Sequence, residues 1–203
     1  MKARSLFSAV SLLFLFGPVM GQTDNEKINW MTWEQAAAKS KEEKKKIILD
    51  VYTEWCRWCE RMDQVTYQDP QIVKYINENY YAVRFDAEFK GDLEYQGKVY
   101  HFVKNGKNGY HELAAELLNG RLSFPSTVFL DEESELIQSI MGYKSPQQFD
   151  CIITYFGANH YKNQPWSAYE RSCMPPPAQA KPEKQNLNTG NKQIPTPRLI
   201  KNR

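Results

Sequence analysis

Apolar residues follow two different periodicities along the chain, and together these predict an α/β domain. Short apolar runs rich in β-branched and aromatic residues predict buried strands at 47–52, 80–87, 126–131 and 135–141. Helix-forming segments without internal Gly, most with an apolar face, predict helices at 29–46, 56–65, 70–79, 111–119 and 146–156. The order strand, helix, strand over 47–87 favours a parallel βαβ unit.

Local signals place several helix ends. Thr32 with Gln35 three residues later forms a capping-box pattern at the start of the first helix. Pro70 suits the first position of a later helix, because its missing N–H has no partner there in any case. The charged run 39–46 is predicted to be a solvated end of the first helix rather than a binding site.

Residues 88–110 are predicted to be an insertion that contains a β-hairpin. Gln96 and Gly97 form a two-residue turn between short strands, and 105–109 is predicted to be a flexible connection. The apolar side chains of the hairpin either offer a surface to a protein substrate or cover an exposed sheet edge: Tyr95, Val99, Tyr100 and Phe102. His111, which follows, is either a proton carrier or an ordinary surface residue at a helix start, and the second is favoured.

The first 21 residues have the pattern of a signal peptide. Lys2 and Arg4 precede an apolar run over 6–16, and small residues stand before Gln22 as at a cleavage site. The run is short for a membrane span, so no stable insertion in a membrane is expected after cleavage. We therefore expect an exported protein, periplasmic or secreted.

The organisation expected after the signal peptide is one domain and an extension. The domain covers 22–157, and the extension covers 158–203. Proline among Gln, Asn, Lys and Thr predicts disorder from about residue 174. Trp166 and Tyr169 are expected to pack back on the domain.

Charge excludes one class of partner. The net charge is +2 over 203 residues, but 22–173 hold 18 basic and 23 acidic residues, a balance of about −5. Such an acidic domain lacks the basic surface that binds the phosphate backbone, so nucleic acid is not an expected partner.

Cys56 and Cys59 carry the chemistry that the sequence indicates. They lie in the first turn of a helix that follows a strand, where the helix N-terminus stabilises a thiolate on the first cysteine. A redox-active pair is favoured, and an inert disulfide remains possible. Glu60 occupies the position that a c-type haem site needs for His, which excludes that site. A zinc site would need further ligands that only folding could supply: Cys151, Cys173, His101, His111 and His160.

The two remaining cysteines, Cys151 and Cys173, have two possible states. In an oxidising compartment they form a disulfide that holds the start of the extension to the last helix. The alternative is two independent thiols, and the sequence does not separate the two.

Three separated motifs resemble the thioredoxin superfamily. They are Trp55-Cys56-Arg57-Trp58-Cys59, Asp50 six residues before the first cysteine, and Phe124-Pro125-Ser126-Thr127 before a strand. The Trp-Cys-x-Trp-Cys form most resembles exported thioredoxin-related proteins of bacteria. The resemblance covers roughly 28–157. It implies a thioredoxin-like fold, in which helices flank a central mixed β-sheet, with a cis peptide before Pro125. Arg57-Trp58 in place of Gly-Pro and the insertion at 88–110 depart from thioredoxin itself.

The resemblance also implies a function, a thiol–disulfide oxidoreductase that acts on exported proteins. Cys56 would attack a partner disulfide, Cys59 would resolve the mixed disulfide, and a buried Asp50 beside a basic residue at Arg84 would move protons. The alternative is that Asp50 is a strand-end residue without a catalytic role, hydrogen-bonded to water. The residues expected to contact substrate are Trp55, Trp58, Phe124 and Pro125.

The expected partners are protein thiols or disulfides and a redox partner protein, with neither cofactor nor metal. The alternative function is a non-catalytic binding module whose cysteine pair stays locked as a structural disulfide.

Overall fold

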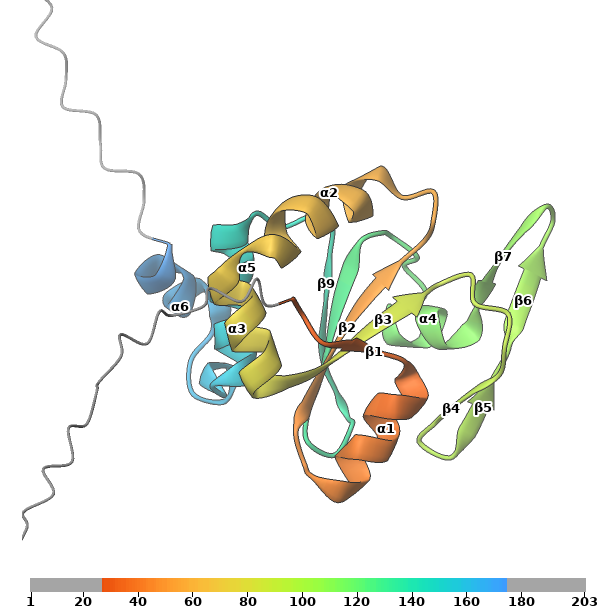
Figure 1. Ribbon diagram of the computed structural model, residues 1–203, viewed down its shortest axis with the longest axis horizontal. Coiled ribbons are helices and arrows are strands. Elements are labelled where there is room, and N and C mark those ends of the chain that lie inside the picture. Colours follow the sequence, from red (N-terminus) through yellow and green to blue (C-terminus); the bar gives the residue numbers. More distant parts are fainter. Residues whose placement is uncertain (1–26, 175–203) are drawn as a thin grey trace, which may run out of the picture.

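The computed structural model describes residues 27–174, and its centre is a five-stranded mixed sheet (Figure 1). The strands lie in the order β1-β3-β2-β8-β9. β3 is parallel to β1 and β2, while β8 is antiparallel to β2 and β9. Their bounds are β1 Trp30–Met31, β2 Lys46–Tyr52, β3 Tyr80–Asp86, β8 Ser126–Leu130 and β9 Leu136–Met141. The predicted α/β class and the parallel βαβ unit are confirmed. The predicted signal peptide and disordered tail lie outside the described residues.

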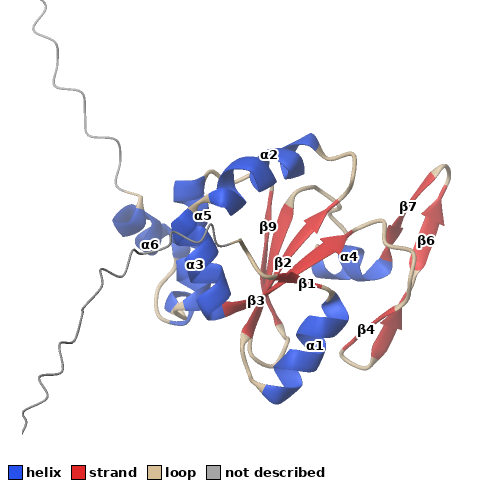
Figure 2. Cartoon of the chain, in the orientation of Figure 1, coloured by secondary structure: helices blue, strands red, loops and turns tan. Residues whose placement is uncertain are grey.

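Helices cover both faces of this sheet (Figures 1 and 2). One face carries α1 and α4, and the other carries α2, α3, α5 and α6. Their bounds are α1 Trp33–Glu42, α2 Arg57–Val65, α3 Pro70–Asn79, α4 Glu112–Leu117, α5 Pro146–Gly157 and α6 Trp166–Cys173, with 3₁₀ turns η1 Thr66–Gln68 and η2 His160–Lys162. Within 27–174, none of these helices combines the length and apolar character that a membrane crossing requires.

The alternation of side chains along β2 divides the core in two. Ile47 and Leu49 pack with Trp33 of α1, whereas Ile48 packs with Met62 of α2 on the opposite face. Asp50 follows Ile48 by two positions and therefore faces the α2 side. This register places a carboxylate inside the apolar layer beneath α2.

The predicted capping box at the start of α1 is confirmed, since Thr32 Oγ1 accepts from the Gln35 amide and Gln35 Oε1 accepts from the Thr32 amide. The prediction of a solvated run over 39–46 is wrong at its end. α1 stops at Glu42, and Lys46 is a buried residue of β2 whose ammonium pairs with Glu132. The charge pattern did not predict this burial, because the aliphatic part of the Lys46 side chain packs in an apolar layer while its ammonium group reaches a carboxylate.

The insertion forms two hairpins, where the sequence predicted one. The first joins β4 Leu93–Tyr95 to β5 Lys98–Tyr100 through the predicted turn, with φ of 51° at Gln96 and 74° at Gly97. The second joins β6 Phe102–Asn105 to β7 Asn108–His111. The predicted flexible connection at 105–109 is therefore wrong, because Gly106 at φ 64° supplies a tight turn.

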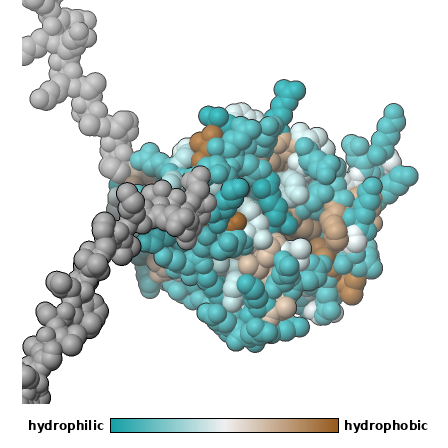
Figure 3. Space-filling model, viewed as in Figure 1, coloured by the Kyte–Doolittle hydropathy of each residue, from teal (hydrophilic) through white to brown (hydrophobic). Residues whose placement is uncertain are grey.

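The β4–β5 hairpin is part of the core. Tyr95 and Tyr100 are buried, and Tyr95 packs edge-on against Trp33 at 5.5 Å between ring centroids. The Trp33 indole also donates to the Glu94 carbonyl at 2.8 Å. These tyrosines neither offer a substrate surface nor cover a sheet edge, since they pack with α1 over one face of the sheet. In the view of Figure 3 most of the surface is hydrophilic, with hydrophobic patches over the insertion.

A disulfide between Cys151 and Cys173 joins α5 to α6, so the pairing that the sequence left open is present. Cys151 is buried with the apolar face of α5. Trp166 and Tyr169 pack against Tyr155 of α5, as expected, with ring centroids 5.2 and 5.1 Å away. The sequence missed α6 because it is only eight residues long and little of it is buried.

Candidate active site at the start of helix α2

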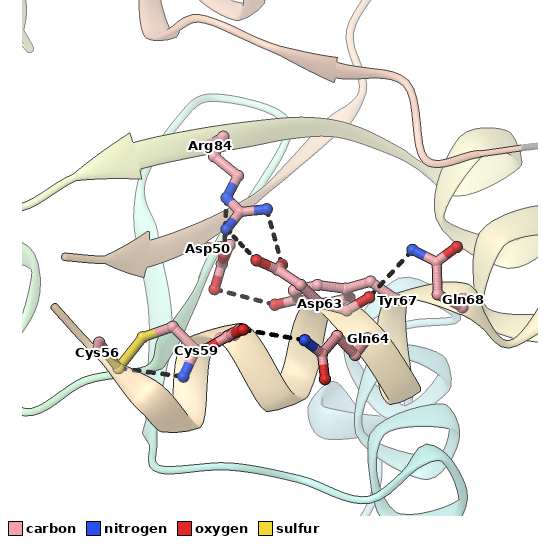
Figure 4. Close-up of polar contacts among 9 residues, drawn as sticks. Asp50, Cys56, Cys59, Asp63, Gln64, Tyr67, Gln68 and Arg84 are labelled. Atoms are coloured by element: carbon pink, nitrogen blue, oxygen red, sulfur yellow. Dashed lines mark hydrogen bonds and ion pairs between the residues drawn. A yellow bond between two sulfur atoms is a disulfide. The ribbon is translucent and has the colours of Figure 1, made fainter. Parts of the chain in front are cut away.

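A disulfide between Cys56 and Cys59 occupies the first turn of α2 (Figure 4). Cys56 is the N-cap residue, and its Sγ accepts from the Cys59 amide at 3.1 Å. This sulfur therefore lies where a helix presents unpaired N–H groups and partial positive charge, both of which stabilise a thiolate. The local geometry that the sequence predicted for the pair is present.

Exposed aromatic side chains flank the disulfide. Trp55 and Trp58 are 66% and 62% exposed, whereas the other tryptophans of the described residues are buried or half-buried. Trp55 lies edge-on to Phe124, with 6.0 Å between ring centroids, and Trp58 lies 5.5 Å from Tyr143. Of the four residues predicted to contact substrate, the structure thus brings Trp55 and Phe124 together and places Trp58 beside Tyr143.

Pro125 lies at the start of β8 behind a cis peptide bond from Phe124, as the resemblance implies. Its carbonyl accepts from the Gly142 amide at 2.7 Å, and this bond ties the loop to the segment after β9. Because Phe124 touches Trp55, the Phe124–Pro125 segment adjoins the residue that precedes Cys56.

Asp50 is buried below this surface, with 2% of its area exposed. The Tyr67 hydroxyl donates to Asp50 Oδ1 at 3.1 Å, and Arg84 Nε lies 3.2 Å from Oδ2 (Figure 4). Burial raises the pKa of Asp50 to about 7, since removal from water disfavours the carboxylate more than Arg84 and Tyr67 stabilise it. Asp50 can therefore hold or release a proton near neutral pH, and the pairing with Arg84 that the resemblance suggested is present.

Asp63 completes a cluster that the sequence reasoning missed. Arg84 directs both terminal nitrogens at the Asp63 carboxylate, at 2.7 and 2.6 Å. In this bidentate pair both terminal nitrogens of the guanidinium bind Asp63, so Nε is the nitrogen that faces Asp50. Helical spacing is the signal that could have found it, because Asp63 follows Cys59 by four positions and faces the same side of α2.

His111 is buried, which corrects the prediction of an ordinary surface residue. Its Nδ1 accepts from the Leu113 amide as the N-cap of α4, and its Nε2 lies 3.0 Å from the Gly91 carbonyl. Burial lowers the pKa of His111, although the Gly91 carbonyl opposes this shift. These contacts give His111 a structural role between the insertion and α4.

Metal ligands do not gather in the described part of the chain. Among residues 27–174 no three His, Cys, Asp or Glu side chains form a group able to hold an ion. Three of the residues considered as zinc ligands have other partners there: Cys151 and Cys173 bind each other, and His101 pairs with Asp92 at 2.8 Å.

Comparison with known proteins relates the chain to thioredoxin-like families. The family model described as "Thioredox_DsbH: Protein of unknown function, DUF255" matches residues 12–154. The chain is 34% identical over 84 residues to spermatogenesis-associated protein 20 of Rattus norvegicus, a match covering 41% of this chain and 10% of that protein. It is 29% identical over 94 residues to the uncharacterized protein B0495.5 of Caenorhabditis elegans, covering 46% and 13%. The chain thus spans only about a tenth of these relatives.

Among solved structures, the chain resembles a thioredoxin-fold protein from Helicobacter pylori. The TM-score is 0.50 at 17% sequence identity, and the match covers 74% of this chain and 86% of the other. This likeness confirms the thioredoxin-like fold that the motifs implied.

Proposed function

The chain belongs to the Thioredox_DsbH family, and on that premise we propose that it is a thiol–disulfide oxidoreductase that works through Cys56 and Cys59. The observation that carries the proposal is the position of the disulfide. It closes the N-terminal turn of α2 between exposed aromatic residues, with a buried acid of raised pKa on the neighbouring strand. The helix-terminus charge at Cys56 and the buried acid below the pair support thiol–disulfide exchange, although the oxidised sulfurs are themselves little exposed.

The reduction of a partner disulfide would proceed in two exchanges. In the first, the Cys56 thiolate attacks one partner sulfur. A Cys56–partner bond forms, the partner S–S bond breaks, and the released thiolate takes up a proton. In the second, Cys59 loses its proton and attacks the Cys56 sulfur, which releases the second partner thiol. Two electrons and two protons pass to the partner, and a dithiol donor then reduces Cys56–Cys59 again. The reverse sequence oxidises a partner dithiol.

Asp50 would serve the second exchange. Cys59 and Asp50 are both buried, one on α2 and the other on β2, so little water can take the Cys59 proton. A carboxylate with a pKa of about 7 is a suitable acceptor, because it is half ionised near neutral pH. Asp63 and Tyr67 position this acid, the first through Arg84 and the second through its hydroxyl.

We propose further that the substrates are exported proteins. The basis is the signal-like segment at 1–21 together with the Cys151–Cys173 disulfide, since such bonds persist in oxidising compartments. Cell fractionation followed by N-terminal sequencing of the recovered protein tests this proposal. A chain that remains in the cytoplasm and still begins at Met1 would contradict it.

The alternative function is a binding module in which the Cys56–Cys59 bond is locked. Titration of the pair against glutathione or dithiothreitol separates the two functions. A reduction potential above about −300 mV supports exchange, and a lower one supports a structural bond. Reduction of 2-hydroxyethyl disulfide should be lost in Cys56→Ser. The matched control, Cys151→Ser with Cys173→Ser, should keep this activity, because that pair lies on α5 and α6.

A further inference from the structure

A groove opens beside the cysteine pair, with a volume of about 280 Å³. Trp55 and Phe124 form one wall, Leu122 lies next to Phe124, and the β6–β7 hairpin forms the other wall. The residues that this hairpin contributes are Asn105, Asn108, Gly109 and Tyr110. The second hairpin of the insertion therefore borders the candidate site, while the first is buried against α1.

We propose that the β6–β7 hairpin adds a second wall to the substrate contact expected at Trp55 and Phe124, and that the groove so formed selects the extended substrate segment next to the cysteine that exchanges with Cys56. This inference rests on the proposed function. Trp55 directly precedes Cys56, so a chain joined to Cys56 as a mixed disulfide starts at the mouth of the groove. The groove surface combines aromatic and leucine side chains with the amides of Asn105 and Asn108. Apolar side chains of a substrate would contact the first, and its backbone N–H and C=O groups would pair with the second.

Charge at one rim indicates which segment fits. Glu88 lines the groove, and its Oε1 accepts from the Trp55 indole at 3.2 Å. Asp86 lies beside it, with Oδ1 2.9 Å from the Glu88 amide nitrogen. Burial raises the pKa of Asp86, and the charges of Glu88 and Glu54 raise it further, against the Glu88 amide hydrogen bond. A basic side chain would relieve the repulsion among these three carboxylates. The preferred segment is therefore apolar beside its cysteine and basic where it passes this rim.

Disulfide-bonded dimers of synthetic heptapeptides test the inference. One peptide has Leu next to Cys and Arg two positions further, a second has Glu in place of Arg, and 2-hydroxyethyl disulfide serves as the small reference. We expect the wild-type chain to reduce the Arg peptide about tenfold faster than the Glu peptide, measured as kcat/KM. In Leu122→Ser the rate on the Arg peptide should fall severalfold relative to the rate on 2-hydroxyethyl disulfide.

Two further variants isolate charge and position. Glu88→Gln keeps an acceptor for Trp55 and removes the charge. The preference for the Arg peptide over the Glu peptide should therefore shrink, while the contribution of the peptide's Leu to the rate should remain. Val99→Ser is the matched control, because Val99 is as exposed as a groove residue but lies on the β4–β5 hairpin away from the groove. It should change neither peptide rates nor the small-disulfide rate.

The outcomes of these experiments distinguish failure of the groove inference from failure of the proposed function. Unchanged peptide rates in both Leu122→Ser and Glu88→Gln, with melting temperatures kept, would overturn the groove inference alone. A wild-type chain inert toward 2-hydroxyethyl disulfide as well would contradict the proposed function. A dimer in sedimentation that Leu122→Ser dissociates would show that a second copy of the chain occupies the groove, and this too would overturn the inference.

Discussion

Replacing Asp50 with Asn should stabilise the oxidised protein at pH 8 by on the order of 4 kcal/mol. Burial raises the pKa of Asp50 from 3.8 to about 7. Between these values the folded protein must keep a proton that the unfolded chain releases, so stability falls as pH rises. Each tenfold change in proton affinity is worth about 1.4 kcal/mol, and about three such changes give this magnitude. Asn has nearly the shape of the protonated acid and carries no charge at any pH.

Urea unfolding at pH 4, 6 and 8 measures this difference in the oxidised state. At pH 4 Asp50 is neutral in the folded protein and only about half ionised in the unfolded chain, so wild type and Asp50→Asn should differ by less than about 1 kcal/mol. The gap should widen through pH 6 and level off above pH 7, where the folded carboxylate also ionises. Glu78→Gln is the control, because its exposed carboxylate lies 4.0 Å from Lys74 and should change stability by no more than about 0.5 kcal/mol at any of these pH values.

Parallel pH profiles for wild type and Asp50→Asn between pH 4 and 8 would refute this reasoning. Such a result would mean that Arg84 stabilises the carboxylate as fully as water does, and that Asp50 is an ordinary ionised acid. The proton-transfer role proposed for Asp50 would then lose its basis, although the exchange chemistry of the cysteine pair would not.

Three other predictions concern groups outside this cluster or next to it. Removal of the Cys151–Cys173 disulfide by paired Ser substitutions should lower the free energy of unfolding by about 3 kcal/mol, since it closes a loop of 22 residues, and chemical denaturation measures the loss. The pKa of His111 is lowered, so its contribution to folding stability is complete above about pH 6.5 and is lost as the pH falls below that value. His111→Asn keeps a side chain that can cap α4, and it should weaken the fall in stability between pH 7 and pH 5. In the reduced protein iodoacetamide should modify Cys56 before Cys59, because Cys56 is the helix N-cap, and equal rates by peptide mapping would contradict the assigned roles.

The elements that the sequence predicted well are those whose signals are local. Strand β2 and helix α3 have strong periodicity and clear ends, and the capping box at Thr32 depends on residues three positions apart. The cysteine pair was found for the same reason, because its chemistry depends on a spacing of three residues after a strand. Asp50 and Pro125 were found through resemblance rather than periodicity.

The features that could not be predicted from the sequence depend on contacts between segments that are distant along the chain. Asp63 meets Arg84 across 21 positions, and Lys46 reaches Glu132 across 86, so neither pair has a local signal. His111 was misjudged because the insertion and β3 bury it, in addition to the contact with the helix that it caps. The groove has the same origin, since its two walls come together only when β6–β7 folds beside the Phe124 loop.

The two hairpins of the insertion should diverge at different rates during evolution. In β4–β5, Tyr95 and Tyr100 belong to the core, so most exchanges there would leave a void, and at Tyr95 also a Ser134 carbonyl without its tyrosine donor. Selection for folding should therefore conserve them. In β6–β7, residues 104–108 are exposed and make no core contact, so substitutions there, except at Gly106 in the turn, should cost little stability. A family in which the first hairpin is constant and the second varies in length and charge could therefore acquire new specificities without rebuilding the domain.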